Sequence, residues 1–120
     1  MRPVKAREVG GVLVLALDDQ ASVNDGQSDL YRKSIYDRIA ERPTPRVAVD
    51  LGAIEFLSSS GVAFLIGLRR RVAGQGGELA LFGLHPDVVD LLGMMKIGPL
   101  FKVGEDEPAA LGLLSPSPAP

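Results

Sequence analysis

Three consecutive hydroxyl side chains, Ser58, Ser59 and Ser60, stand directly before Gly61 and a run of apolar residues that is typical of a helix. A serine at a helix start can cap it, because its oxygen accepts a hydrogen bond from a backbone N–H that has no partner within the helix. The same place favours a phosphate, since the N-terminus of a helix carries partial positive charge. The serines therefore predict either a simple cap or an acceptor for a phosphoryl group.

Ester hydrolysis is a second chemistry to weigh, and it needs a serine beside a histidine and a carboxylate. Ser59, the single histidine His85 and Asp50 would be the members of such a triad. The sequence argues against it, because there is no Gly-x-Ser-x-Gly turn and 120 residues leave little room for an oxyanion hole and a substrate pocket. We therefore predict no enzymatic activity, with His85 decorating the start of a helix.

Other side chains near the serines have both structural and binding interpretations. For Asp50, which ends a hydrophobic segment, we favour a structural role as acceptor of N–H bonds from the following loop over a contact to a partner or nucleotide. Phe64 and Leu68 lie off the main apolar stripe, so they either form an exposed docking patch or pack under the next helix. Residues 69–71, all arginine, form a solvated helix face or steer an acidic partner.

The elements that must position these residues follow from hydrophobic runs and turn signals. Strands are expected at 4–9, 12–17, 46–51, 78–82 and 100–103, and helices at 28–41, 60–72, 86–95 and 107–114. The segment 18–26 is polar, and Asn24-Asp25-Gly26 is a turn signal. The order β-β-α-β-α-β-α-β-α predicts an α/β fold with a mixed, mostly parallel sheet of four to five strands and about four helices.

Composition narrows the classes of function. The formal net charge of −2 and the 5% aromatic content argue against a nucleic-acid binder. A single histidine without any cysteine argues against a transition-metal site, and we expect no cofactor. No apolar run approaches the roughly 18 residues that span a bilayer, so we expect a soluble cytoplasmic protein. Residues 1–114 are expected to form one domain, and the Pro- and Ser-rich stretch 115–120 a loose extended tail.

The segment from residue 46 to residue 72 resembles the STAS domain, and within that family the bacterial anti-sigma factor antagonists. In these proteins a strand ending in Asp is followed by a short apolar link, by Asp-Ser-Ser-Gly or Asp-Ser-Thr-Gly, and by an aliphatic helix. The likeness covers most of the chain beyond Val9, except residues 18–27, and Ser58 stands where the family usually has Asp. The matching positions are Asp50, Phe56, Ser59, Ser60 and Gly61.

The resemblance implies a regulator that binds an anti-sigma factor, itself a serine kinase, and thereby releases a sigma factor without touching DNA. It implies that this kinase phosphorylates Ser59 and so ends the interaction, with Ser58 and Ser60 as rival sites, and that a PP2C-type phosphatase restores it. It is compatible with a monomer or weak dimer. The partner-binding residues would be Asn24, Asp25, Ser58, Ser59, Ser60, Gly61, Phe64 and Leu68.

Two other functions stay open at this point. The first is a STAS scaffold or subunit of a stress-signalling or lipid-transport complex without a phosphoswitch, which the serine at position 58 keeps in view. The second is a small module that binds a nucleotide or a lipid.

Overall fold

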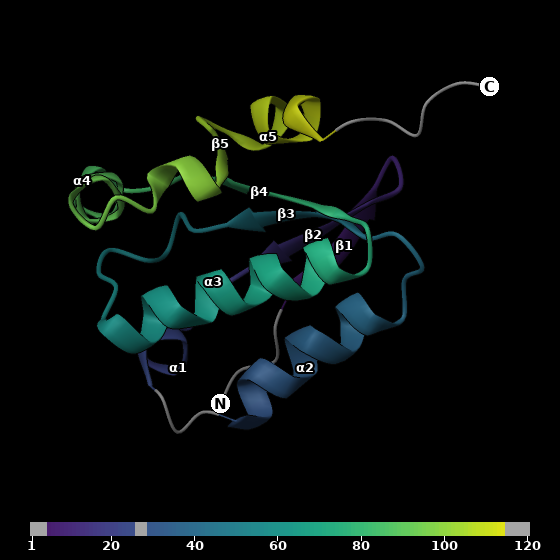
Figure 1. Cartoon of the computed structure of the whole chain (residues 1–120), viewed down its shortest axis with the longest axis horizontal. Coiled ribbons are helices and arrows are strands. Elements are labelled where there is room, and N and C mark those ends of the chain that lie inside the picture. Colours follow the sequence, from purple (N-terminus) through teal and green to yellow (C-terminus); the bar gives the residue numbers. More distant parts are fainter. Residues whose placement is uncertain (1–4, 26–28, 115–120) are drawn as a thin grey trace.

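In the computed structural model of the protein, residues 5–25 and 29–114 are described, and they form a sheet covered by helices on both faces (Figure 1). The strands are β1 (Lys5–Val9), β2 (Val12–Ala16), β3 (Arg46–Asp50), β4 (Glu78–Phe82) and β5 (Lys102–Gly104). They lie in the order β1-β2-β3-β4-β5. The β1–β2 pair is antiparallel and the other three pairs are parallel, which confirms the predicted mixed, mostly parallel sheet.

The helices alternate with the strands largely as the hydrophobic pattern predicts. They are α1 (Gln20–Asn24), α2 (Asp29–Ala40), α3 (Ser59–Gly74), α4 (Pro86–Met94) and α5 (Glu107–Leu113), with a 3-10 turn, η1, at Gly98–Leu100. Helices α2 and α3 lie on one side of the sheet and α5 lies on the other (Figure 1). The expected tail 115–120 and the turn residue Gly26 lie outside the described residues.

Helix α1, like the 3-10 turn η1, was not predicted from the sequence pattern. The segment 18–26 was expected to be a polar connection, but Asp19 caps a single helical turn within it. The Asp19 carboxylate accepts a hydrogen bond from the backbone N–H of Ser22 at 3.1 Å and from its hydroxyl at 2.8 Å. Val23 is the buried residue of this turn, so one apolar side chain and a cap contribute to fixing it.

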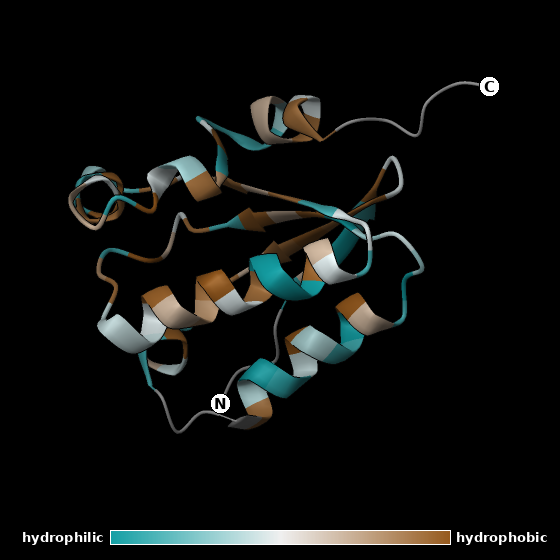
Figure 2. Cartoon of the chain, in the orientation of Figure 1, coloured by the Kyte–Doolittle hydropathy of each residue, from teal (hydrophilic) through white to brown (hydrophobic). Residues whose placement is uncertain are grey.

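The central strands are apolar on both faces, because both faces of the sheet are covered (Figure 2). Alternate residues belong to two separate cores. The larger core contains Leu13 and Leu15 of β2, together with the equivalent residues of β3 and β4 and the inner face of α3. The intervening residues, such as Val14 and Ala48, pack with Ala110 of α5. This alternation confirms that the hydrophobic runs at 12–17, 46–51 and 78–82 are covered strands.

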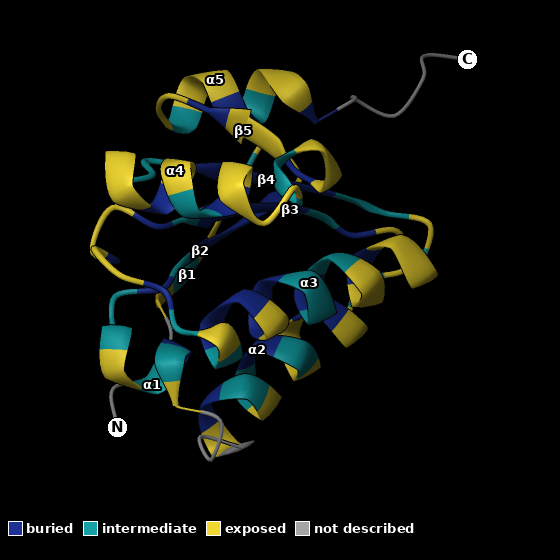
Figure 3. Cartoon of the chain, turned by 60° about the vertical axis from the view of Figure 1, so that its left-hand side comes forward, coloured by how far each residue is buried: buried dark blue, intermediate teal, exposed yellow. Residues whose placement is uncertain are grey.

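Helix α3 packs against both the sheet and α2, which lies beside it on the same side of the sheet, and this decides the position of its apolar residues (Figure 3). Phe64 is 1% exposed and Leu68 is 0% exposed, so the expectation that they form a docking patch is wrong. A helix that packs against both a sheet and a neighbouring helix needs apolar side chains over a wide arc. The stripe of α2 that covers them consists of Tyr31, Ile35 and Ile39, all buried.

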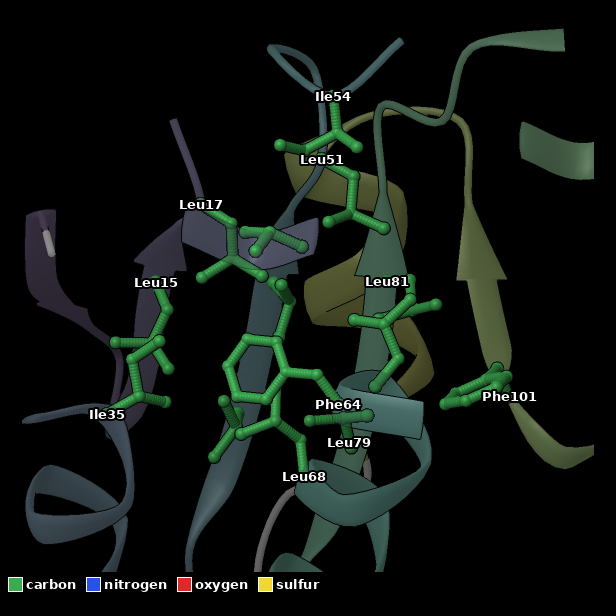
Figure 4. Close-up of a cluster of buried hydrophobic side chains, with 14 of the residues drawn as sticks. Leu15, Leu17, Ile35, Leu51, Ile54, Phe64, Leu68, Leu79, Leu81 and Phe101 are labelled. Atoms are coloured by element: carbon green, nitrogen blue, oxygen red, sulfur yellow. The ribbon is translucent and has the colours of Figure 1, made fainter. Parts of the chain in front are cut away.

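Aromatic contacts reinforce this helix pair. The Phe64 ring, which lies in the middle of the buried cluster in Figure 4, is tilted against Tyr31 and meets Tyr36 edge-on, with ring centroids 6.5 Å and 6.0 Å apart. The guanidinium of Arg32 lies 5.0 Å from the centre of the Phe64 ring. The three-arginine stretch also serves the fold, since Arg71 stacks over Tyr36 at 4.0 Å.

Candidate functional site

The N-terminus of α3 brings the three serines to one corner of the molecule, and they differ in environment. Ser58 is the N-cap, and its hydroxyl oxygen accepts a hydrogen bond from the N–H of Gly61 at 3.1 Å. The same hydroxyl donates to the carbonyl of Asn24 at 3.0 Å, and the Ser58 N–H donates to Oδ1 of Asn24 at 2.8 Å. The Ser58 hydroxyl is therefore engaged as both acceptor and donor.

Ser59 is the exposed member of the three, whereas Ser58 and Ser60 are half-buried. The Ser60 carbonyl accepts a hydrogen bond from Arg32 of α2 at 3.3 Å, which places a cation beside the first turn of α3. The serine that the family resemblance marks is thus the one whose surroundings leave room for a larger group.

The loop that leads into this corner is held by two amide side chains of α1, which we call the α1 clamp: Gln20 and Asn24. Oε1 of Gln20 accepts hydrogen bonds from the N–H groups of Glu55 at 2.6 Å and Phe56 at 3.1 Å. Nδ2 of Asn24 donates to the carbonyl of Phe56 at 2.8 Å. The clamp residues are one helical turn apart, so both side chains reach the same strip of loop backbone.

Gly61 is explained by the closeness of the clamp. A Cβ atom at position 61 would overlap Oδ1 of Asn24 and lie 3.0 Å from Cδ2 of Leu57. The glycine of the serine motif is therefore a packing requirement, which lets α1 approach the first turn of α3.

Of the predicted partner-binding residues, Asn24 and Asp25 do lie at this corner. Asn24 is half-buried and binds the loop, while Asp25 is exposed and its carbonyl accepts from Arg32 at 3.4 Å. Gln20 and Arg32 were not predicted as neighbours of the serines. Phe56 was predicted only as a position that matches the family pattern, and not as a partner-binding residue. It is 60% exposed, whereas Phe64 is buried.

Asp50 and His85 meet at Gly52, in the loop after β3. Oδ1 of Asp50 accepts a hydrogen bond from the Gly52 N–H at 2.8 Å, which is the backbone contact that the structural interpretation of this aspartate predicts. Nε2 of His85, at the N-cap of α4, forms a 2.8 Å hydrogen bond with the Gly52 carbonyl. Both side chains thus fasten the loop that follows β3.

Tyr31 is the titratable group with the clearest perturbation near the corner. Burial raises the pKa of its phenol, and the nearby carboxylates of Asp18 and Asp19 raise it further. The phenol is consequently held in its neutral form beneath α1.

Two further observations apply to the part of the chain that the structure describes. No group of three or more His, Cys, Asp or Glu side chains is arranged to hold a metal ion. No helix there has the length and apolarity needed to cross a membrane.

Comparison with known proteins gives a consistent result. A protein-family model described as the STAS domain matches residues 3–110. The chain is 28% identical over 94 residues to an anti-sigma F factor antagonist from Paenibacillus polymyxa, which covers 76% of this chain and 79% of that protein.

Solved structures share the fold. An anti-sigma-factor antagonist (STAS) domain protein from Planctomyces limnophilus superposes with a TM-score of 0.78 at 17% identity, covering 93% of this chain and 98% of that one. The Bacillus cell fate determinant SpoIIAA in its phosphorylated form superposes with a TM-score of 0.62 at 18% identity, covering 92% of this chain and 98% of that one.

Proposed function

Because the chain belongs to the STAS domain family, we propose that it is an anti-sigma factor antagonist whose binding is switched off by phosphorylation of Ser59. The observation that carries this proposal is the difference among the three serines. Ser59 is exposed at the start of α3, while the hydroxyl of Ser58 is occupied by Gly61 and Asn24. On this proposal the protein is a binder and a substrate of the partner kinase, and not itself an enzyme.

The docking surface that we propose consists of Phe56, Ser59 and Ala63. Phe56 offers an exposed aromatic ring, and Ala63, a small residue, is exposed one turn after Ser59. Aromatic residues, Phe among them, are enriched at protein interfaces relative to the rest of the surface. This surface replaces Phe64 and Leu68, which the core retains.

The chemistry of the switch follows from charge. A phosphoryl group adds about −1.5 to −2 charge at neutral pH. On Ser59, three residues after Phe56, that charge would oppose the approach and desolvation of a partner. The same charge is favourable for the domain itself, since the N-terminus of α3 carries partial positive charge. Phosphorylation is thus expected to end binding without unfolding the protein.

The comparisons support this proposal without deciding it. The Paenibacillus polymyxa relative is named an anti-sigma F factor antagonist. SpoIIAA, which shares the fold, has been solved in a phosphorylated form. A serine-kinase anti-sigma factor is accordingly the partner that we propose, and a PP2C-type phosphatase would reverse the modification.

The proposal is tested by peptide mass spectrometry on the protein from its native cells, with and without stress, followed by binding assays. We expect phosphate on Ser59, binding of the anti-sigma factor by the wild type, and loss of that binding in Ser59→Glu. Ser60→Glu is the matched control and should be bound more like the wild type.

Undiminished binding by Ser59→Glu, or phosphate only on Ser58 or Ser60, would contradict the assignment. Assembly of the protein into large particles that Ser59→Glu leaves unchanged would indicate a scaffold subunit instead.

A further inference from the structure

We propose that Gln20 and Asn24 are positioning residues for the docking surface, because they hold residues 55–58 in the conformation that exposes Phe56 beside Ser59. This inference rests on the proposed function and deepens it, since it says what keeps the binding corner ready for a partner.

The loop has little secondary structure of its own to hold it. Residues 53–58 form neither helix nor strand. Ile54 and Leu57 anchor the segment in the core, at 0% and 3% exposure, yet Phe56 between them is 60% exposed. Burial of a phenyl ring is favourable, so an unrestrained loop would tend to turn Phe56 onto nearby apolar surface.

The α1 clamp opposes that movement by binding the backbone of Phe56. The Phe56 N–H donates to Gln20, and the Phe56 carbonyl accepts from Asn24. The flanking N–H groups of Glu55 and Ser58 are bound by the same two side chains. Phe56 is thus fixed at its backbone while its side chain remains in solvent, which is the state required for docking.

The two clamp residues act through different chemistry, and this makes the inference specific. Gln20 binds the loop through its oxygen, as an acceptor of two N–H bonds. A carboxylate can accept the same two bonds, so Gln20→Glu should retain the clamp. Asn24 both accepts, from Ser58, and donates, to Phe56. Asn24→Asp loses the donor and places a negative charge against the Phe56 carbonyl, so this variant should not hold the loop at Phe56.

The test combines amide hydrogen exchange with a measurement of affinity for the partner. The partner is the serine-kinase anti-sigma factor, encoded in the same genome, that the wild-type protein binds. The variants are Gln20→Ala, Gln20→Glu, Asn24→Ala and Asn24→Asp. Gln75→Ala is the matched control, because Gln75 also joins two elements through its side-chain amide, donating to the carbonyls of Ile39 and Arg42 at 3.2 Å and 2.7 Å. That residue lies at the other end of α3.

We expect exchange to accelerate at least about tenfold at Glu55 and Phe56 in Gln20→Ala, and at Ser58 in Asn24→Ala, because each change removes the acceptor of those N–H bonds. Asn24→Asp keeps the acceptor for Ser58 but repels the Phe56 carbonyl, so it should weaken binding. The thermal midpoint should stay within the range of Gln75→Ala. If the competent conformation falls to a tenth of the population, Kd rises about tenfold. Gln20→Glu and Gln75→Ala should bind like the wild type.

The possible failures are distinguishable. Unchanged exchange at these three amides in Gln20→Ala and Asn24→Ala would show that the loop holds itself, and would overturn the positioning role. Faster exchange with unchanged affinity would overturn it too, because the fixed loop would then not matter for docking. If the wild-type protein captures no anti-sigma factor, the proposed function itself fails, whatever the exchange shows.

Discussion

Oδ1 of Asn24 occupies the space into which a side chain at position 61 would project, so Asn24 in this position requires glycine at position 61. Gly61 does not have the left-handed backbone that usually requires glycine. What it provides is the absence of a Cβ atom, which allows α1 to touch the first turn of α3.

Replacing Gly61 by alanine should therefore destabilise the protein, although alanine is the better helix former. We expect a loss of about 1–3 kcal/mol, because the new methyl group must displace Asn24 or move the helix. The matched control is Gly74→Ala in the same helix, where a Cβ meets no atom within 4 Å. That change should leave stability unchanged or raise it by up to about 1 kcal/mol. Urea denaturation of both variants gives the comparison, and equal stabilities would contradict the packing argument.

Phe56 and Phe64 should respond in opposite ways to the same substitution. Phe56→Ala removes an exposed ring, so we expect a change in stability within about 0.5 kcal/mol but a clear loss of affinity for the partner. Phe64→Ala empties the space between Tyr31 and Tyr36, and we expect a loss of about 3–5 kcal/mol. Chemical denaturation combined with titration calorimetry separates the two effects. A large loss of stability in Phe56→Ala would disprove its assignment to the surface.

Ser58 is expected to tolerate neither alanine nor the aspartate that the family pattern favours. Ser58→Ala loses the cap of α3, at a cost of about 1 kcal/mol. Ser58→Asp keeps an acceptor for the Gly61 N–H but cannot donate to the Asn24 carbonyl, which now accepts from the Ser58 hydroxyl at 3.0 Å. We expect it to be less stable than the wild type by about 1 kcal/mol.

The control for Ser58 is Ser59→Ala, one residue further along, which should change stability by less than about 0.5 kcal/mol. Thermal unfolding monitored by circular dichroism would compare the stabilities of these variants with that of the wild type. A Ser58→Asp protein more stable than the wild type would show that the donation to Asn24 contributes nothing.

Tyr31 should make the protein sensitive to alkali. Its pKa is raised in the folded state by burial and by nearby carboxylates, whereas an unfolded tyrosine ionises near pH 10. The folded state therefore holds a proton that the unfolded state releases above about pH 10, so the stabilisation is complete below that pH and is lost as the pH rises.

The slope from this one group approaches about 1.4 kcal/mol per pH unit. Tyr31→Phe should remove this slope, which denaturation at a series of pH values between 8 and 11 would measure. Identical slopes for the two proteins would rule out Tyr31 as the cause.

The sheet and most helices could be predicted from the sequence because each depends on a local pattern. The covered strands β3 and β4 appear as unbroken apolar runs, and α2 shows Tyr31, Ile35 and Ile39 on one face. For Phe64 and Leu68 the sequence left both an exposed patch and packing under a helix open, because periodicity shows which residues of a helix are apolar. It does not show how many neighbours cover them.

The ranking of the serines required the structure. The partner that engages the Ser58 hydroxyl is Asn24, which is 34 residues away in the chain. The short helix that carries it, α1, has too few residues for a periodic pattern. The sequence did offer a local signal, since Asp19 precedes Ser22 at capping distance and Gln20 and Asn24 are spaced to share a face.

That separation of 34 residues also bears on the order in which the molecule acquires its parts. The chain between Asn24 and Ser58 contains α2 and β3, so this contact closes a long loop, and contacts that close long loops are slow to form. The corner that carries Ser59 should accordingly be completed late in folding and open early in local unfolding. A partner that recognises this corner would then bind fully folded molecules and not partly folded ones.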